Sequence, residues 1–256
     1  MADTVVITRP AAQAGALATQ LGALGFTAVR FPLLEIRPLD DPSALKNVLA
    51  RLEEFAFVAF VSPNAIDATF AWLDAWPLAL PLAVMGEGSR QALARHGVTA
   101  PDYRILSPAD PLRTDSETLL QTIDVETLRG GRVLILRGEA GREFLADALR
   151  AEGVQVEQVA AYRRTVPRPS PARRQQLRDL LDQRARWIIT SSEALQNLFD
   201  AVQDLNRAED VAKLQHQKIY VSHHRIAQTA RSLGLSQVVL TASGDAAMLT
   251  ALQSCA

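Results

Sequence analysis

The sequence contains little cysteine, little histidine and almost no net charge, and each shortage excludes a class of protein. Cysteine occurs once in 256 residues, at Cys255, so an internal disulfide is impossible and a thiol on a frayed tail is expected. The four histidines show no metal-ligand spacing, and the adjacent His223 and His224 are interpreted as part of a solvated loop. A formal net charge of −1 argues against a nucleic-acid partner, which would require a basic face.

Long apolar runs and common catalytic motifs are also missing. The most apolar segments, Ala56–Val61 and Pro77–Met85, are too short to span a bilayer. The amino terminus has Asp3 where a signal peptide would need a basic start. The sequence has no GxGxxG or GxxxxGK[ST] loop for nucleotide phosphates and no Gly-x-Ser-x-Gly nucleophile elbow. These absences predict a soluble, cytoplasmic protein with no membrane partner and no metal site.

The clearest positive feature is an internal repeat. The segment Val133–Thr165 resembles the opening of the chain, Val5–Ile36, and laying Arg137 on Arg9 offsets the two by half of the 256 residues. Several isoleucine, leucine and glycine positions match at the same offset. Such self-similarity indicates two versions of one supersecondary unit.

The pattern along each half is a short β-branched strand followed by a helix of period 3.6, repeated several times. This alternation predicts an α/β fold of two doubly wound parallel-sheet domains related by the internal repeat. Phe26–Ile36 is expected to be one strand that Pro32 interrupts, which places it at an edge or a bend.

Two proline-rich segments, one after each copy of the repeat, predict linkers at 37–43 and 162–171. If the chain crosses between domains at both linkers, the first domain is discontinuous and the second is the middle of the chain. We expect that arrangement rather than two sequential halves, with residues 1–37 plus 166–256 in the first domain and 41–162 in the second.

Candidate site residues follow the predicted strands, because ligands of open parallel sheets bind at the carboxyl ends of strands. These positions are mostly small hydroxyls, glycines and arginines that precede helices, at 8–10, 62–64, 86–89, 137–138, 190–192 and 222–225. Free N–H groups there would suit an anionic ligand, and two such rims facing each other would form a cleft. The alternative is purely structural, since Ser62 and Ser191 are good helix N-caps in any protein.

Tyr162 stands where the first copy of the repeat has Leu34, which makes it the leading candidate for chemistry. A tyrosine at a strand end is usually a half-buried ring with its hydroxyl in water. The functional interpretation is that its hydroxyl donates a hydrogen bond or a proton to a leaving group.

The motifs together resemble a known family over nearly the whole chain. In order they are VVITRP, FPLLEI, FVSPNAI, VMGEGSRQAL, ILRGEAGREFLADALRAEGVQVEQVAAYRR, ITSSEAL and SHHRIAQTARSLG. This ordered set resembles the uroporphyrinogen-III synthase family. The resemblance implies a monomer of two α/β domains, joined by a two-stranded linker, with the substrate in the cleft between them. It also implies cyclisation of hydroxymethylbilane to uroporphyrinogen III, with inversion of ring D, loss of water and no cofactor.

The resemblance also implies roles for individual residues. The family's tyrosine, proposed to assist departure of the hydroxyl group, falls on Tyr162. The positions that match its substrate contacts are Thr8, Arg9, Ser62, Asn64, Gly86, Ser89, Arg137, Gly138, Thr190, Ser191 and Ser222. Two alternatives are a two-domain small-anion binding module without turnover and a nucleotide-sugar transferase.

Overall fold

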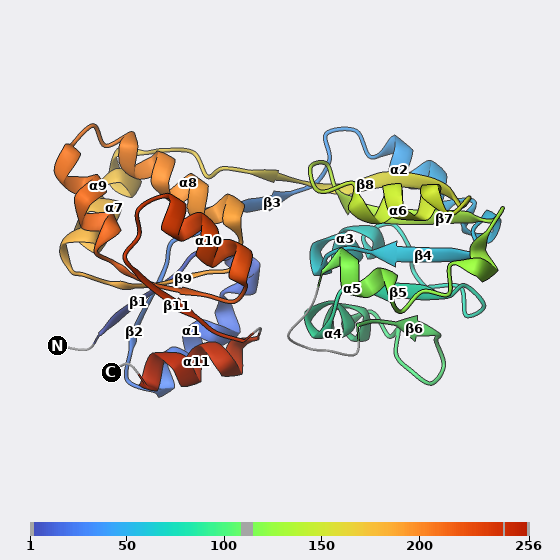
Figure 1. Cartoon of the computed structure of the whole chain (residues 1–256), viewed down its shortest axis with the longest axis horizontal. Helices are drawn as coiled ribbons and strands as arrows, with labels where there is room; N and C mark the ends of the chain where they lie inside the picture. The colour runs from blue at the N-terminus through green and yellow to red at the C-terminus, as the bar shows by residue number, and fades with distance from the viewer. Residues whose placement is uncertain (1–2, 109–114, 243, 255–256) are drawn as a thin grey trace. The chain divides into compact units, whose positions relative to one another are not determined.

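The chain divides into two compact units in a computed structural model that describes residues 3–108, 115–242 and 244–254. Cys255, expected on a frayed tail, lies outside the described residues. Unit 1 contains the chain up to Glu35 and again from Thr165 onward, and unit 2 is Ile36–Arg164. In Figure 1 unit 1 is therefore blue at its start and orange to red at its end.

Unit 1 is built on a parallel sheet with the strand order β11-β10-β9-β1-β2. Alternate residues of its strands point to opposite faces, so each face carries its own apolar cluster. One face is covered by α7, α8, α9 and α10, and the other by α1 and α11. The strands are β1 (Thr4–Ile7), β2 (Thr27–Arg30), β9 (Arg186–Ile189), β10 (Lys218–Val221) and β11 (Gln237–Leu240). The helices are α1 (Gly15–Ala23), α7 (Pro171–Asp182), α8 (Ser192–Gln203), α9 (Ala208–Gln215), α10 (His224–Ser232) and α11 (Asp245–Ser254), with a 3-10 helix at Ala11–Gln13.

Unit 2 is built on a sheet with the strand order β3-β8-β7-β4-β5-β6, in which β8 to β6 are parallel. Helices α2, α3 and α4 cover one face, and α5 and α6 cover the other. The strands are β3 (Glu35–Arg37), β4 (Phe57–Phe60), β5 (Leu82–Val84), β6 (Ile105–Leu106), β7 (Arg132–Gly138) and β8 (Gln155–Thr165). The helices are α2 (Ser43–Leu49), α3 (Pro63–Phe70), α4 (Glu87–Arg95), α5 (Ser116–Leu120) and α6 (Phe144–Ala151), with 3-10 helices at Leu52–Glu54 and Glu126–Leu128.

These two sheets confirm the predicted α/β class with parallel sheets covered on both faces. When β1 is matched with β7, the order β11-β10-β9-β1-β2 corresponds strand by strand to β6-β5-β4-β7-β8. Equal strand order is what an internal repeat would produce, and the repeat itself stays a prediction. No helix among the described residues is both long and apolar enough to cross a membrane.

The prediction of one strand over Phe26–Ile36 is wrong, because β2 and β3 belong to different sheets. Beyond β2 the backbone still donates from Phe31 N to Ile7 O and from Leu33 N to Thr8 O, both at 3.0 Å. Pro32, between these donors, has no N–H to continue the ladder. The chain then leaves this sheet.

The chain passes from one unit to the other within β3 and β8, which are neighbours in the sheet of unit 2. The prolines of the segments 37–43 and 162–171 lie after these strands rather than in them. A proline is tolerated after a strand because no ladder hydrogen bond there requires its missing N–H. The domain ranges 1–37 with 166–256 and 41–162, and the linkers at 37–43 and 162–171, stay a prediction.

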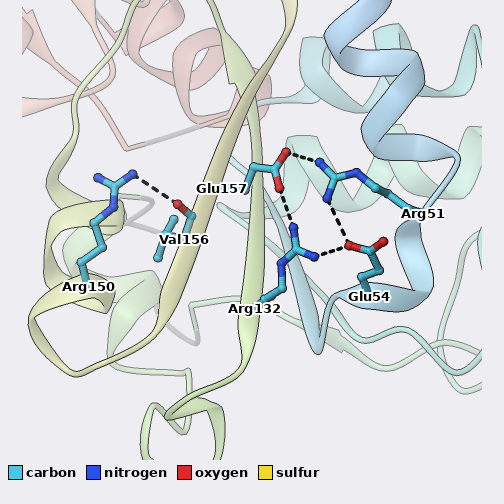
Figure 2. A network of polar contacts seen from close by, with 6 residues as sticks. All are labelled: Arg51, Glu54, Arg132, Arg150, Val156 and Glu157. Atoms are coloured by element: carbon cyan, nitrogen blue, oxygen red, sulfur yellow. Dashed lines mark hydrogen bonds and ion pairs between the residues drawn. The ribbon is translucent and has the colours of Figure 1, made fainter.

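Near the start of β7, Arg51, Glu54, Arg132 and Glu157 form a closed ring of alternating charges (Figure 2). Arg51 donates to Glu54 at 3.2 Å and to Glu157 at 2.6 Å, while Arg132 donates to Glu157 at 3.0 Å and also to Glu54. The Arg132 guanidinium also lies 4.9 Å from the centre of the Phe55 ring. Because Arg132 begins β7, this ring lies at the end of the sheet opposite to the carboxyl ends of the strands.

Replacing Glu54 by Gln should lower the melting temperature by roughly 1–3 °C at neutral pH, since this partly exposed ring gains little from each pair. The pKa of Glu54 lies below its ordinary value, first because Arg51 donates to it and further because of Arg132. A lowered pKa stabilises the fold above the pKa of the unfolded carboxyl group, and this contribution is lost as the pH falls through the folded value. The difference between wild type and Glu54→Gln should therefore close as the pH falls below the ordinary range of a glutamate carboxyl group.

The measurement is a series of thermal melts from neutral to acidic pH. Glu53→Gln, in the same 3-10 helix, is the matched control. Its melting temperature should equal that of wild type at every pH, because none of the ion pairs between described residues involves Glu53. A Glu54→Gln melting temperature that equals wild type at neutral pH would mean that the ring does not stabilise the fold.

Candidate active site

The winding of the sheet in unit 2 reverses between β4 and β7. These strands are parallel neighbours, with Phe60 opposite Leu136. From β4 the chain continues through β5 and β6 to one side, whereas from β7 it continues to β8 on the other side. The two connections therefore diverge at the carboxyl ends, and a crevice opens there in folds of this kind.

Tyr162 lies at this point because β8 pairs with β7. Its partner across the ladder is Gly138, the last residue of β7, after a register shift between Arg137 and Gly138. The ladder closes with a hydrogen bond from Glu139 N to Tyr162 O at 3.0 Å. Because of this shift, Tyr162 rather than Ala161 lies opposite the last residue of β7.

The hydroxyl of Tyr162 lies 3.1 Å from Ser62 Oγ, so the two groups share a hydrogen bond. Ser62 is the N-cap of α3, and its Oγ also accepts from Ala65 N at 3.2 Å. Pro63 follows at the first helical position, where its missing N–H costs nothing. The Ser-Pro sequence therefore fixes the serine hydroxyl at the place where β4 ends.

Gly138 allows the tyrosine ring to approach the backbone. A Cβ atom on Gly138 would lie 3.0 Å from Tyr162 Cζ and 3.2 Å from its hydroxyl oxygen. Contacts this short are tighter than most side chains make, so any larger residue at position 138 would force the tyrosine ring to shift by a few tenths of an ångström. Glycine is favoured here by the close approach of the ring, not by an unusual backbone angle.

The structure differs from the expectation of a half-buried ring with a wet hydroxyl. Tyr162 is only 4% exposed and packs in the cluster that contains Phe60 and Ile66. Its hydroxyl has a protein partner, Ser62. Only a small part of the phenol can therefore contact a ligand in this conformation.

Arg137 does not extend from the edge as a free cation. Its side chain is buried and donates to Gln158 Oε1 at 2.7 Å and to the carboxylate of Glu143. The pKa of Glu143 lies below its ordinary value, first because Gln158 donates to it and then because Arg137 does. Spacing in the sequence does not indicate these two partners, because they come from the loop before α6 and from β8.

In unit 1, the side chains of the residues that follow β1 are also paired within the protein. Thr8 is buried, and its Oγ1 donates to Ile188 O at 2.7 Å, which ties β1 to β9 where the winding reverses. Arg9 forms an ion pair of 2.5 Å with Asp245, the first residue of α11. Two of the three arginines in the predicted edge segments, Arg9 and Arg137, are therefore paired with carboxylates of the chain itself, whereas the third, Arg225, is exposed in the first turn of α10.

The remaining predicted residues lie at the carboxyl edges of their own sheets. Ser191 caps α8 by accepting from Ala194 N at 3.0 Å. His223, expected in a solvated loop, instead caps α10 by accepting from Arg225 N at 3.1 Å. The edge of unit 1 holds Thr8, Thr190, Ser191 and Ser222, and the edge of unit 2 holds Ser62, Asn64, Gly86, Ser89, Gly138 and Tyr162.

Unit 1 also contains a separate pocket of about 180 Å³ beside α7 and α8. The guanidinium of Arg173 lies 3.9 Å from the centre of the Phe31 ring at this pocket, and burial lowers the pKa of Arg173. None of the predicted site residues lines the pocket. Across residues 3–108, 115–242 and 244–254, no group of three or more His, Cys, Asp or Glu side chains could hold a metal ion.

Two α/β units with parallel sheets, each with hydroxyl groups along its carboxyl edge, define a class of proteins that bind ligands where strands end. The family model described as uroporphyrinogen-III synthase HemD matches residues 15–250. The chain belongs to the uroporphyrinogen-III synthase family. This match confirms the resemblance that the ordered motifs indicate.

Curated relatives and solved structures agree with this assignment. The chain is 32% identical to uroporphyrinogen-III synthases of Salmonella typhimurium and of Escherichia coli, and each match covers 98% of this chain and 100% of the relative. A mutant uroporphyrinogen III synthase from the extremely thermophilic bacterium Thermus thermophilus aligns with a TM-score of 0.61 at 18% identity, covering 99% of this chain and 98% of that one. The corresponding protein of Helicobacter pylori aligns with a TM-score of 0.59 at 14% identity, covering 99% and 100%. At these identities the two structures support the fold alone.

Gly138→Ala should destabilise the protein by about 1–3 kcal/mol, because the added methyl group meets a ring that is packed in the core. Urea unfolding measures this change. Gly22→Ala in α1 is the matched control, since a Cβ there meets nothing within 4 Å and alanine favours a helix. Equal stability of Gly138→Ala and Gly22→Ala would show that the tyrosine ring has room to move.

Proposed function

We propose that this chain is a uroporphyrinogen-III synthase that cyclises hydroxymethylbilane, with inversion of ring D and loss of water, in tetrapyrrole biosynthesis. Family membership over residues 15–250 is the observation that carries this proposal. The full-length relatives are named as synthases, which disfavours a binding module without turnover. The nucleotide-sugar transferase alternative is disfavoured for the same reason.

Backbone amides at the carboxyl edges are the proposed partners of the substrate's carboxylates. Helices α3, α4, α8 and α10 each begin directly after a strand, so their first N–H groups and positive dipole ends lie at those edges. Arg9 and Arg137 are already paired with Asp245 and Glu143. A substrate carboxylate would have to displace these acids to reach either guanidinium, whereas the amides need no such exchange.

The chemistry requires little more than a proton donor and a fixed geometry. Departure of the hydroxyl group as water leaves a cationic, reactive azafulvene, and the bilane can then close to the uninverted isomer without help. The enzyme must therefore hold the chain so that the inverting route is faster, and positioning of this kind can supply several kcal/mol. We assign proton donation to Tyr162. The net reaction loses water without oxidation, so we propose no cofactor.

The proposed substrate contacts are those at the two edges, with Thr8, Arg9, Ser62, Asn64, Gly86, Ser89, Arg137, Gly138, Thr190, Ser191 and Ser222 as their residues. We also propose that the protein is a cytoplasmic monomer that binds no nucleic acid. Size-exclusion chromatography with light scattering tests the oligomeric state directly, and a dimeric mass would contradict it.

An isomer assay tests the activity. Hydroxymethylbilane is generated from porphobilinogen by its deaminase, with or without this protein, and the oxidised porphyrins are separated by chromatography. A shift from isomer I to isomer III is the expected result. If isomer I still dominates with folded protein present, the synthase proposal fails and the edges would have to be interpreted as a binding site.

Tyr162→Phe should lower kcat by about tenfold to a hundredfold, because one general-acid group is lost while the geometry is kept. The ring is buried, so the phenylalanine should occupy the same space and leave the melting temperature within a few degrees. The measurement is the initial rate of isomer III formation at saturating substrate. A loss near a millionfold, as for removal of a nucleophile, would show that this role is misassigned.

A further inference from the structure

We propose that Ser62 is a positioning residue whose hydroxyl donates to the phenol oxygen of Tyr162 and so leaves the phenol proton free for the departing hydroxyl group. The inference rests on the proposed function, because it concerns how Tyr162 acts in that reaction. It assigns Ser62 a task through its side chain, whereas a substrate contact at this position would need only the backbone.

The hydrogen-bonding capacity of Ser62 supports this orientation. A serine hydroxyl has one proton and two lone pairs. One lone pair of Ser62 Oγ accepts from Ala65 N at 3.2 Å, and the phenol oxygen of Tyr162 lies 3.1 Å away. Between two hydroxyls only one proton can lie on the line that joins them. If the serine supplies it, the tyrosine proton points elsewhere and can reach a ligand.

The N-terminus of α3 favours this direction. Ala65 N–H is in the first helical turn, where the backbone donors carry a partial positive charge. Accepting this donor makes the serine O–H a stronger donor in turn, because hydrogen bonds in series polarise one another. The resulting series runs from Ala65 N–H through Ser62 to Tyr162 and would stabilise negative charge that forms on the phenol oxygen.

Packing fixes the other end of the series. The Tyr162 ring is held in the core of unit 2 and lies close against the backbone of Gly138, where an added methyl group would push the ring aside by a few tenths of an ångström. This packing limits how far the phenol can shift toward a ligand. Its hydroxyl has one defined place, and the serine decides which way the hydroxyl proton points.

The proposed step balances as an acid-assisted elimination. The C–O bond of the hydroxymethyl group breaks, and the phenol proton of Tyr162 joins the departing oxygen, which leaves as water. The phenolate is held by the Ser62 hydroxyl. When the macrocycle closes, the pyrrole carbon that forms the new bond loses a proton, which restores the phenol. No oxidant or further reactant is needed.

Unit 1 contains the cap without the phenol. Ser191 caps α8 as Ser62 caps α3, but the predicted repeat places Leu34 where unit 2 has Tyr162, and Leu34 is buried. A capping serine is therefore part of both units, and in unit 2 it meets a phenol that can donate a proton.

The test must separate loss of the cap from loss of the Tyr162 contact. Ser62→Ala removes both, whereas Ser62→Gly removes the hydroxyl at little cost to the helix, because glycine is itself a good N-cap. Ser170→Ala is the matched control, because Ser170 also caps a helix with proline at the next position and accepts from Arg173 N at 3.2 Å. Ser170 contacts no part of the proposed site. Ser62→Thr keeps a hydroxyl and should restore activity.

Each variant is measured as kcat, KM and isomer composition, alone and combined with Tyr162→Phe. Ser62→Ala and Ser62→Gly should lower kcat by about fivefold to tenfold, the contribution of one neutral hydrogen bond, with little change in KM. Ser170→Ala should keep the wild-type kcat although its melting temperature falls through loss of the cap. Within the Tyr162→Phe background, neither change at position 62 should lower kcat further.

The outcomes separate this inference from the proposed function. Absence of isomer III with the wild-type protein would contradict the function itself. An active wild type in which the Ser62 and Tyr162 losses multiply would overturn the positioning role, because independent contributions add in free energy. A higher KM with unchanged kcat for Ser62→Gly would also overturn it and assign Ser62 to substrate binding.

Discussion

Parallel strand pairing is the constraint on which the rest of this structure depends. A parallel neighbour can be reached only by crossing back over the sheet, so every strand of the series ends at the same edge and nearly every one is followed by a helix. That single requirement gathers helix N-termini, capping serines and strand-end glycines at one edge of each sheet. The opposite edge is available for stability, and the charged ring around Arg132 lies there.

The chemistry of the site depends on which polar groups at the carboxyl edges are already paired within the protein. Arg9 and Arg137, two of the arginines that the sequence offers as anion partners, are held by Asp245 and Glu143, whereas Arg225 is exposed. The threonine hydroxyl that follows β1 already donates to the backbone of β9. The groups that we propose to meet the substrate are chiefly backbone N–H groups and one buried phenol beside a serine hydroxyl. Such an edge suits an enzyme that must hold a flexible, reactive anion in one geometry rather than attack it.

Much of this could be predicted from the sequence, for physical reasons that differ between elements. The alternation of short apolar strands and amphipathic helices determines the α/β class, and Ser62-Pro63 predicts a capped helix because each residue satisfies a local requirement. In Phe26–Ile36, Pro32 gave a local signal of an edge or a bend, but the two strands belong to different sheets, and that separation depends on long-range pairing. The partners of Arg137 and Arg9 were equally hidden, because Gln158 and Asp245 approach through tertiary packing. The burial of Tyr162 also depends on a glycine that is distant in sequence.

The central claim is that held geometry selects the isomer, whereas Tyr162 only speeds departure of the hydroxyl group. The most direct measurement is the isomer composition from a single turnover of hydroxymethylbilane with Tyr162→Phe in excess, so that all substrate is bound before it reacts. We expect slow formation of isomer III with little isomer I. Predominant isomer I from fully bound substrate would contradict it, because the tyrosine would then direct the inversion itself.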